Sequence, residues 1–237
     1  MIKFFRKIRY ELMSENKGGK YFKYAIGEIV LVVVGILIAL QINNWNEGKK
    51  TKKFEHEILR DIADAIDGNF FQIDLSLRNN QAAVASANII LNALENNLPY
   101  HDSLDFHFSK SISWVSAKFN NPAYESLKSY GVNLITNDTI RSLISIYDNG
   151  WMETLAERQE NYFYNTASPI LTKLFDKVAM RTKMKPFDYD RLKDSQEYIS
   201  ILNTSISNRE DQTFWYKEWK ESLDFLLKTI NNELKNN

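Results

Sequence analysis

The chain has 237 residues, of which 44% are hydrophobic and 25% are charged, a composition typical of a folded protein with a real core. Basic and acidic residues number 30 each, so the chain as a whole lacks the positive charge that attracts nucleic acid. The absence of cysteine excludes disulfides, thiolate metal sites and cysteine nucleophiles. We therefore expect one sizeable domain and no nucleic-acid partner.

Residues 1–20 are predicted to be a basic cytoplasmic segment that ends in an elbow. Apolar residues recur every three or four positions among the cations, which is typical of a short amphipathic helix lying in the membrane interface. The residues expected to contact lipid headgroups are Lys3, Arg6, Lys7 and Arg9. Ser14 to Lys20, with two adjacent glycines, is expected to form the flexible elbow. Docking of this helix to a cytoplasmic partner is the alternative.

Residues 21–47 are predicted to form a single transmembrane helix. The apolar centre runs from Ile29 to Leu40, and Tyr24 and Trp45 mark the boundaries, where amphipathic rings are favoured at a membrane surface. A buried helix of a soluble protein is the first alternative, but it would need protein on every side. A cleaved signal peptide is the second, but no small-x-small cleavage site follows the apolar run.

The N-terminus is expected on the cytoplasmic side of the inner membrane, with residues 48–237 outside the cytoplasm. Four lysines follow the span at positions 49, 50, 52 and 53, so the basic residues on its two sides are nearly balanced. Long C-terminal domains, however, are translocated largely regardless of their charge. The basic N-terminal segment therefore decides the expected orientation.

Two features of the span suggest contacts with another helix. Gly35 and Ala39 are four residues apart on one face, so a second backbone can approach closely there, in this chain's own copy or in a partner. Glu28 is a candidate intramembrane polar contact, because a carboxylate at this depth is costly unless it pairs or reaches the interface. Snorkelling of Glu28 to the headgroups is the simpler interpretation.

The rest of the chain predicts an all-α fold, an antiparallel helical bundle. A helix with an apolar stripe from Phe54 to Leu77 is expected to reach about Asn97, with interruptions at Gly68 and at Asn79-Asn80. Shorter helices are expected at 104–117 and 123–130, the second ending at Gly131. Asn137 or Thr136 is expected to cap a helix that continues past Gly150, Pro169 to kink the next one, and Asp188 to cap a helix to about Ser207. A last helix carries a stripe of Trp215, Trp219, Leu223, Leu226, Ile230 and Leu234.

No motif in the sequence carries recognisable chemistry. His56-Glu57 begins like a zinc-protease motif, but the second histidine is missing, because position 60 is Arg60. His101 and His107 flank Asp102 and Asp105 with no metal-ligand spacing, and Asp188-Tyr189-Asp190 is far short of a calcium loop. We therefore expect no catalytic residue, no metal and no cofactor.

Roughly the first fifty residues resemble a known group of proteins. The residues that carry the resemblance are Met1 to Arg9, Ser14 to Lys17, Tyr24 to Ile29 and Gly35 to Glu47, and more loosely Tyr124 to Gly131. They are similar to a family of uncharacterised single-pass membrane proteins from the Gram-negative bacterial envelope, catalogued as a domain of unknown function. The resemblance implies an envelope location and brings no activity, substrate or catalytic residue.

Together these features predict a non-catalytic, membrane-anchored scaffold or adaptor. Its helical domain outside the cytoplasm is expected to bind an envelope or membrane protein, or to sense a condition, and homo-oligomers are possible through the span. The alternative is an accessory subunit of a membrane transport or motor complex that uses Glu28. An enzyme of unrecognised type is the third possibility.

Overall fold

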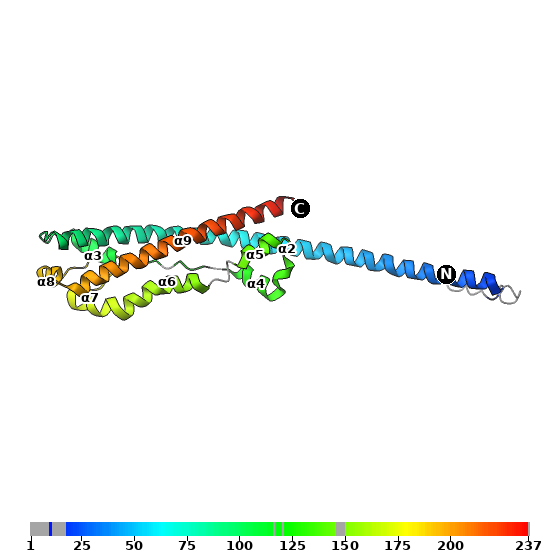
Figure 1. The fold of residues 1–237 in the computed structure, drawn as a ribbon, viewed down its shortest axis with the longest axis horizontal. Coiled ribbons are helices and arrows are strands. Elements are labelled where there is room, and N and C mark those ends of the chain that lie inside the picture. The colour runs from blue at the N-terminus through cyan, green and yellow to red at the C-terminus, as the bar shows by residue number, and fades with distance from the viewer. Residues whose placement is uncertain (1–9, 11–17, 116, 120, 146–149, 237) are drawn as a thin grey trace. The chain divides into compact units, whose positions relative to one another are not determined.

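A computed structural model describes residue 10 and residues 18–115, 117–119, 121–145 and 150–236. The predicted all-α fold is confirmed. The chain divides into two compact units, Met1–Glu55 and His56–Asn237. The helices in Figure 1 are α2 (Gly18–Glu95), α3 (Leu104–Ser111), α4 (Pro122–Tyr130), α5 (Asp138–Ile144), α6 (Gly150–Tyr162), α7 (Ser168–Leu174), α8 (Tyr189–Lys193) and α9 (Gln196–Asn236).

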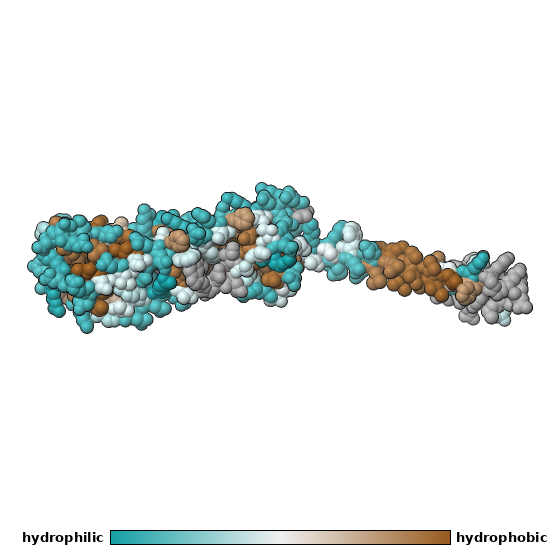
Figure 2. Space-filling model, viewed as in Figure 1, coloured by the Kyte–Doolittle hydropathy of each residue, from teal (hydrophilic) through white to brown (hydrophobic). Residues whose placement is uncertain are grey.

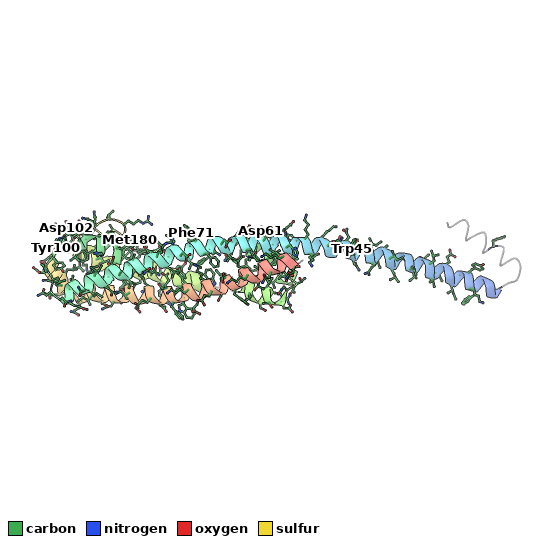
Figure 3. All side chains as sticks on the ribbon, turned by 90° about the horizontal axis from the view of Figure 1, so that it is seen from above. Trp45, Asp61, Phe71, Tyr100, Asp102 and Met180 are labelled. Carbon is green, nitrogen blue, oxygen red and sulfur yellow. The ribbon has the colours of Figure 1, made fainter. Side chains whose placement is uncertain are left out.

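The described part of the first unit is dominated by the N-terminal part of α2. Its apolar residues from Ile29 to Leu40 are exposed, and Figure 2 shows them as a continuous hydrophobic surface. Trp45, labelled in Figure 3, is also exposed, and the ammonium group of Lys49 lies 3.7 Å from its ring centroid. The helix begins at Gly18, so the last three residues of the predicted elbow are helical. The predicted headgroup contacts Lys3, Arg6, Lys7 and Arg9 lie outside the described residues.

In the second unit α2 buries the predicted apolar stripe. Ile58, Ile62, Ile66 and Ile73 are almost fully buried. The interruptions expected at Gly68 and at Asn79-Asn80 are wrong, since α2 is helical through all three residues. One helical glycine costs only about 1 kcal/mol relative to alanine, which the buried isoleucines on either side outweigh. The two asparagines make tertiary hydrogen bonds instead of ending the helix.

Residues Asn97 to Pro99 determine where α2 ends. Asn97 has a φ of 52°, and the amide of Leu98 donates to the carbonyl of Ala93 at 2.9 Å. This is the left-handed cap with which many helices end, and asparagine tolerates it better than other side chains. The helix therefore stops just before Pro99, as predicted.

Polar side chains of α2 hold an extended segment that follows α3. The helix predicted for 104–117 ends at Ser111, which corrects the prediction. Beyond it, Ser76 donates its hydroxyl to the carbonyl of Val115 at 2.8 Å, and Asn79 donates its amide to the carbonyl of Ser113 at 3.2 Å. Because α2 supplies these donors, the carbonyl groups of the segment are paired without a helix.

Helix caps were predicted well, whereas the length of the following helices was not. Asn137 caps α5 by accepting bonds from the amides of Thr139 and Ile140, and Gly131 ends α4 with a φ of 98°. The helix expected to run continuously past Gly150 is wrong, because α5 ends at Ile144 and α6 begins at Gly150. Residues 146–149, between these two helices, lie outside the described residues.

A π-helical turn precedes Pro169, the residue at which the sequence predicts a kink. Residues Phe163–Ala167 form this turn, and α7 then starts with proline in its first turn. Proline has no amide hydrogen and its ring clashes with the carbonyl four residues earlier, so the hydrogen-bonding register shifts. One extra residue is accommodated without breaking the chain of helices.

The C-terminal helix is longer than expected. Asp188 caps α8 by accepting from the amide of Arg191 at 3.0 Å, but α8 ends at Lys193. A single helix, α9, then covers the range assigned to two, from Gln196 to Asn236. Its predicted stripe is buried at Trp219, Leu223, Leu226 and Ile230, whereas Trp215 is 38% exposed.

The hydrophobic core of the second unit lies where α2, α3, α7 and α9 meet. Phe108, Phe175 and Tyr198 stack at its centre, with ring centroids 5.2 Å and 5.4 Å apart for the first and second pairs. Such tilted aromatic pairs add to the stabilisation from burial alone. Beside this core α9 runs antiparallel to α2, because Asp74 pairs with Lys220 while the later Asn80 bonds to the earlier Gln212.

Arg209 of α9 is a buried cation without a carboxylate partner in the described part of the chain. It is 1% exposed and donates to the carbonyl oxygens of Ser205 and Ser113, at 2.9 and 3.0 Å. Burial lowers the pKa of Arg209 to about 10, so the group stays charged at neutral pH. Only carbonyl dipoles offset the cost of removing this charge from water.

We expect Arg209→Met to stabilise the second unit. Methionine fills a similar volume without the desolvation cost, and replacing even paired buried charges by packed apolar residues is often neutral or stabilising, by up to about 4 kcal/mol. The check is thermal unfolding of the full chain in detergent, followed by far-UV circular dichroism. Arg158→Met, which removes an exposed pair with Asp211, is the control and should change the free energy of unfolding by less than about 1 kcal/mol. A lower midpoint for Arg209→Met would show that its two hydrogen bonds outweigh the desolvation cost.

Candidate functional site

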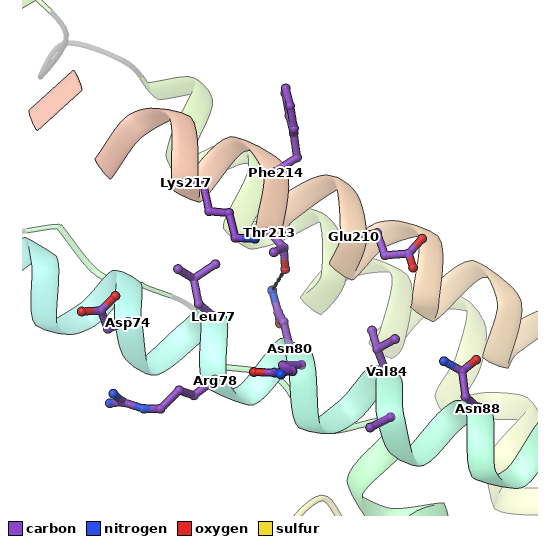
Figure 4. A pocket seen from close by; sticks show the side chains of 12 residues that line it. Asp74, Leu77, Arg78, Asn80, Val84, Asn88, Glu210, Thr213, Phe214 and Lys217 are labelled. Atoms are coloured by element: carbon purple, nitrogen blue, oxygen red, sulfur yellow. Dashed lines mark hydrogen bonds between the residues drawn. The ribbon is translucent and has the colours of Figure 1, made fainter. Parts of the chain in front are cut away.

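An open groove of about 770 Å³ lies between α2 and α9 in the second unit. Figure 4 shows it from close by, with Asn80 and Thr213 linked across it and Phe214 pointing away from α2. From Asp74 to Asn88 the α2 wall extends over about 21 Å at the helical rise. The lining residues are Asp74, Leu77, Arg78, Asn80, Gln81, Val84, Ala85, Asn88, Glu210, Thr213, Phe214 and Lys217.

Both walls of the groove carry a stripe with alternating spacings of three and four residues. On α2 the stripe consists of residues 74, 77, 81, 84 and 88, and on α9 of residues 210, 213 and 217. This spacing places side chains along one side of each helix and is the pattern with which a helix packs against a neighbour in a coiled coil. The two antiparallel helices thus present two rows of side chains that run side by side. In the described part of the chain, no third helix lies between them.

Charged side chains mark the two ends of the groove. At one end Asp74 is paired with Lys220 at 2.6 Å, so the charges left over are those of Arg78 and Lys217. Figure 4 shows Lys217 reaching from α9 toward α2. Glu210, seven residues before Lys217, stands at the other end. None of Arg78, Lys217 and Glu210 has an ion-pair partner among the described residues, and the groove is therefore electrically polarised.

The floor of the groove contains a buried amide pair. Asn80 donates to Gln212 at 2.8 Å, and both side chains are less than 5% exposed. Gln212 in turn donates weakly toward the carbonyl of Leu155 and the hydroxyl of Tyr216, at 3.4 and 3.5 Å. The Oδ1 atom of Asn80 accepts no hydrogen bond within the described part of the chain. Because a buried polar pair fits only one partner position, it fixes the register of α2 against α9.

Large aromatic side chains stay in solvent near the groove. Phe214 on its rim is 55% exposed, Phe71 on α2 is 61% exposed, and Phe225 on α9 is 55% exposed. Phe214 and Phe225 are three helical turns apart and share one side of α9. Exposed aromatic residues of this size often mark surfaces that contact another protein.

The N-terminal part of α2 is a second candidate site. By length and composition α2 is the helix, within the described residues, that could cross a membrane, and none of its most apolar 18-residue stretch is buried. The predicted boundary residues Tyr24 and Trp45 lie on it and are exposed. A side chain added at Gly35 would meet nothing within 4 Å, so the face that Gly35 shares with Ala39 is open. Glu28 lies on the same helix, one turn after Tyr24.

The sequence motifs considered for catalysis do not converge. His101 contacts Asp102 on the surface, whereas His107 contacts the hydroxyl of Ser86 at 3.1 Å. Asp105 is buried and accepts from Tyr100 at 2.6 Å, and this bond together with burial raises the pKa of Tyr100 to about 12. Among the described residues no three histidine or acidic side chains are placed to hold a metal ion.

Comparison with known proteins gives a family without a known activity. Residues 28–124 match a family of unknown function (DUF6090). The predicted resemblance to an uncharacterised family is confirmed over this range, which begins at Glu28 and ends at Tyr124. It includes the α2 wall of the groove and excludes α9. No curated protein and no solved structure matches the chain.

The groove was missed in the sequence, although one signal was available. The buried stripe of α2 places polar residues at core positions, namely Asn69, Ser76 and Asn80, between Ile66, Ile73 and Ala83. Polar residues at such positions need partners elsewhere in the chain. Of these three, Asn80 belongs to the Asn79-Asn80 pair that the sequence predicts as an interruption, and the partner helix α9 cannot be identified from periodicity alone.

We expect Asn80→Ala to destabilise the second unit by about 1–3 kcal/mol, because Gln212 loses the donor that satisfies its buried oxygen. Asn88→Ala is the matched control. It removes an exposed asparagine from the same groove and should change stability by less than about 0.5 kcal/mol. Chemical denaturation of the full chain in detergent measures both. Equal effects of the two substitutions would contradict the structural role of the buried amide pair.

Proposed function

We propose that the protein is a membrane-anchored binding protein without catalytic activity, a scaffold or adaptor of the bacterial envelope. The observation that carries the proposal is the open α2–α9 groove, whose two ridged walls and unpaired charges are suited to another protein surface. The apolar part of α2 supplies the anchor. The helical second unit supplies the binding surface.

Exposure of the apolar residues supports the anchor. A core helix of a soluble protein meets the same criteria of length and composition, but its apolar residues are covered by protein, and those in the most apolar 18-residue stretch of α2 are not. Leaving twelve consecutive residues from Ile29 to Leu40 in water would forgo most of the hydrophobic free energy available to them. A bilayer provides the apolar surroundings, with Trp45 and Lys49 at the depth of the headgroups.

The inner membrane with a cytoplasmic N-terminus is the topology that we propose. The basic residues Lys3, Arg6, Lys7 and Arg9 favour retention of the N-terminal side, and a C-terminal unit of this size is translocated largely independently of its charge. The second unit then faces the space outside the cytoplasm. The absence of cysteine fits that location without requiring it.

Among the described residues, the groups with altered pKa values lie outside the groove. Burial raises the pKa of Tyr198 and raises that of Tyr216 to about 12, and it lowers that of Arg209. All three side chains are buried between helices and none lines the groove. Catalytic sites usually gather such groups in one cleft, next to the substrate. The groove instead offers a contact surface.

The topology can be tested with single cysteines, because the chain has none of its own. We expect Asn232→Cys, at an exposed position of α9, to react with a membrane-impermeant maleimide in intact spheroplasts of a bacterial host. A cysteine at Lys7 should react only after the membrane is permeabilised. The reverse pattern would place the second unit in the cytoplasm, and extraction of the protein by alkaline carbonate would contradict the anchor itself.

Crosslinking in native membranes, read by mass spectrometry, tests the role of the span. We compare the intact chain with Glu28→Gln and with Gly35→Leu, because the first removes the intramembrane charge and the second fills the open face next to Ala39. If the span is only an anchor, as the proposal has it, neither substitution changes the crosslinked partners. Loss of a partner in Glu28→Gln would favour a subunit of a transport or motor complex instead.

A further inference from the structure

The α2–α9 groove has the form of an incomplete helical bundle. Its walls repeat side chains every three and four residues over about four turns of α2, a length that a small molecule would not fill and that one helix would. The floor is apolar at Leu77, Val84 and Ala85, and the charges stand at the ends. A coiled coil accepts a further helix through apolar seam positions and flanking charges that select the partner, and in the α2 stripe Leu77 and Val84 are the apolar positions whereas Asp74, Gln81 and Asn88 are polar.

We propose that the groove receives an amphipathic helix of another protein, one that carries an acidic residue and a basic residue about two turns apart beside its apolar face. The acidic residue meets Arg78 and Lys217, and the basic residue meets Glu210. Lys217 and Glu210 are seven residues apart on α9, about 10 Å along the helix axis, which sets the spacing in the occupant. The inference rests on the proposed binding function and specifies its partner chemistry.

Charge complementarity is what distinguishes this occupant. The ion pair between Asp74 and Lys220 is closed within the chain, whereas Arg78, Lys217 and Glu210 are left for a partner. A helix with like charges at both positions would place one of them against a group of its own sign. Exposed pairs of this kind contribute modestly to affinity but decide orientation and partner choice.

A second copy of the chain is a poorer occupant. Two copies that meet symmetrically through this surface would place groove against groove, and two concave surfaces leave each other unfilled. A parallel arrangement would also set Arg78 and Lys217 of one copy against the same cations of the other. A helix of another protein fills the groove and brings opposite charges to both of its ends.

The probes are three synthetic helical peptides of about 20 residues with the same apolar seam. One has Glu and Lys seven residues apart, one has Lys at both positions, and one has Glu at both. Binding to the full-length protein in nanodiscs is measured by fluorescence anisotropy. We expect the Glu-and-Lys peptide to bind about five- to tenfold more tightly than either of the others.

Charge reversal in the protein should redirect this preference. In the double variant Arg78→Glu/Lys217→Glu, positions 78, 210 and 217 of the groove are all acidic. The peptide with two lysines should therefore become the tightest ligand. The control, Arg181→Glu/Lys183→Glu, reverses two exposed cations outside the groove and should keep the original order. Equal affinity of the three peptides for the unmodified protein, no saturable binding up to about 1 mM, or an unchanged order in the groove variant would each overturn the proposal.

Two further measurements separate this inference from the proposed function. A photo-crosslinking amino acid is placed at Gln81 inside the groove and, in a second variant, at the exposed Asn231 of α9. A cellular partner that crosslinks from position 231 and never from position 81 would support the binding function. It would also show that the partner does not bind in the groove, which overturns this inference. Sedimentation of Val84→Glu completes the test, since dissociation of a dimer by this substitution would show that the occupant is a second copy.

Discussion

The register between α2 and α9 is the constraint on which the groove depends, and the buried amide pair of Asn80 and Gln212 sets it. Apolar side chains can slide past one another by a helical turn at little cost, whereas a buried amide that loses its partner cannot. The pairing places Lys217 of α9 near the level of Arg78 of α2. Without this register the charges at the two ends of the groove would not fall on the same levels of both helices.

Other buried polar groups between the helices also fix one arrangement at a cost in stability. Arg209 lies one turn before Thr213 of the groove wall and is buried against carbonyl oxygens without a counter-charge in the described chain. Lys110, whose pKa is lowered by burial and by the charge of Arg209, bonds to Asn79 at 2.8 Å. An all-apolar interface would be more stable. The polar groups instead hold the extended segment around Ser113 in one position against α2 and α9.

A structural feature could be predicted from the sequence when residues close to it in the chain determine it. Local signals were sufficient for Asn137 and Asp188 as caps, for Gly131 and for the end of α2, because a cap is decided within a few residues. The stripe from Ile58 to Ile73 was also evident, since burial follows the helical period. The apolar stretch from Ile29 to Leu40 was evident as well, because it follows from composition alone.

Features that depend on contacts with residues far away in the chain were missed, because the sequence near the feature does not show those contacts. The asparagines at 79 and 80 have low helix propensity, and only their bonds to residues 113 and 212 explain why the helix continues. The extended segment after Ser111 has a helical pattern in sequence, but donors from α2 pair its carbonyl groups. The groove itself is lined by residues 74–88 of α2 and residues 210–217 of α9, which are more than 120 residues apart in the chain, so neither wall alone shows it.

The two candidate surfaces of α2 differ in the kind of neighbour that they require, and this difference bears on function. The stretch from Ile29 to Leu40 is uniformly apolar around the helix, so a lipid phase satisfies it and no specific partner is needed. The groove wall from Asp74 to Asn88 alternates apolar and polar side chains, and its charges are left unpaired only at the ends. Such a surface gains nothing from lipid, because the polar groups would lose water without replacement. It gains from a protein helix that returns hydrogen bonds and opposite charges at the right spacing. In the function that we propose, recognition is therefore a property of the amphipathic part of the helix, and a substitution in the apolar part should affect location before it affects partner choice.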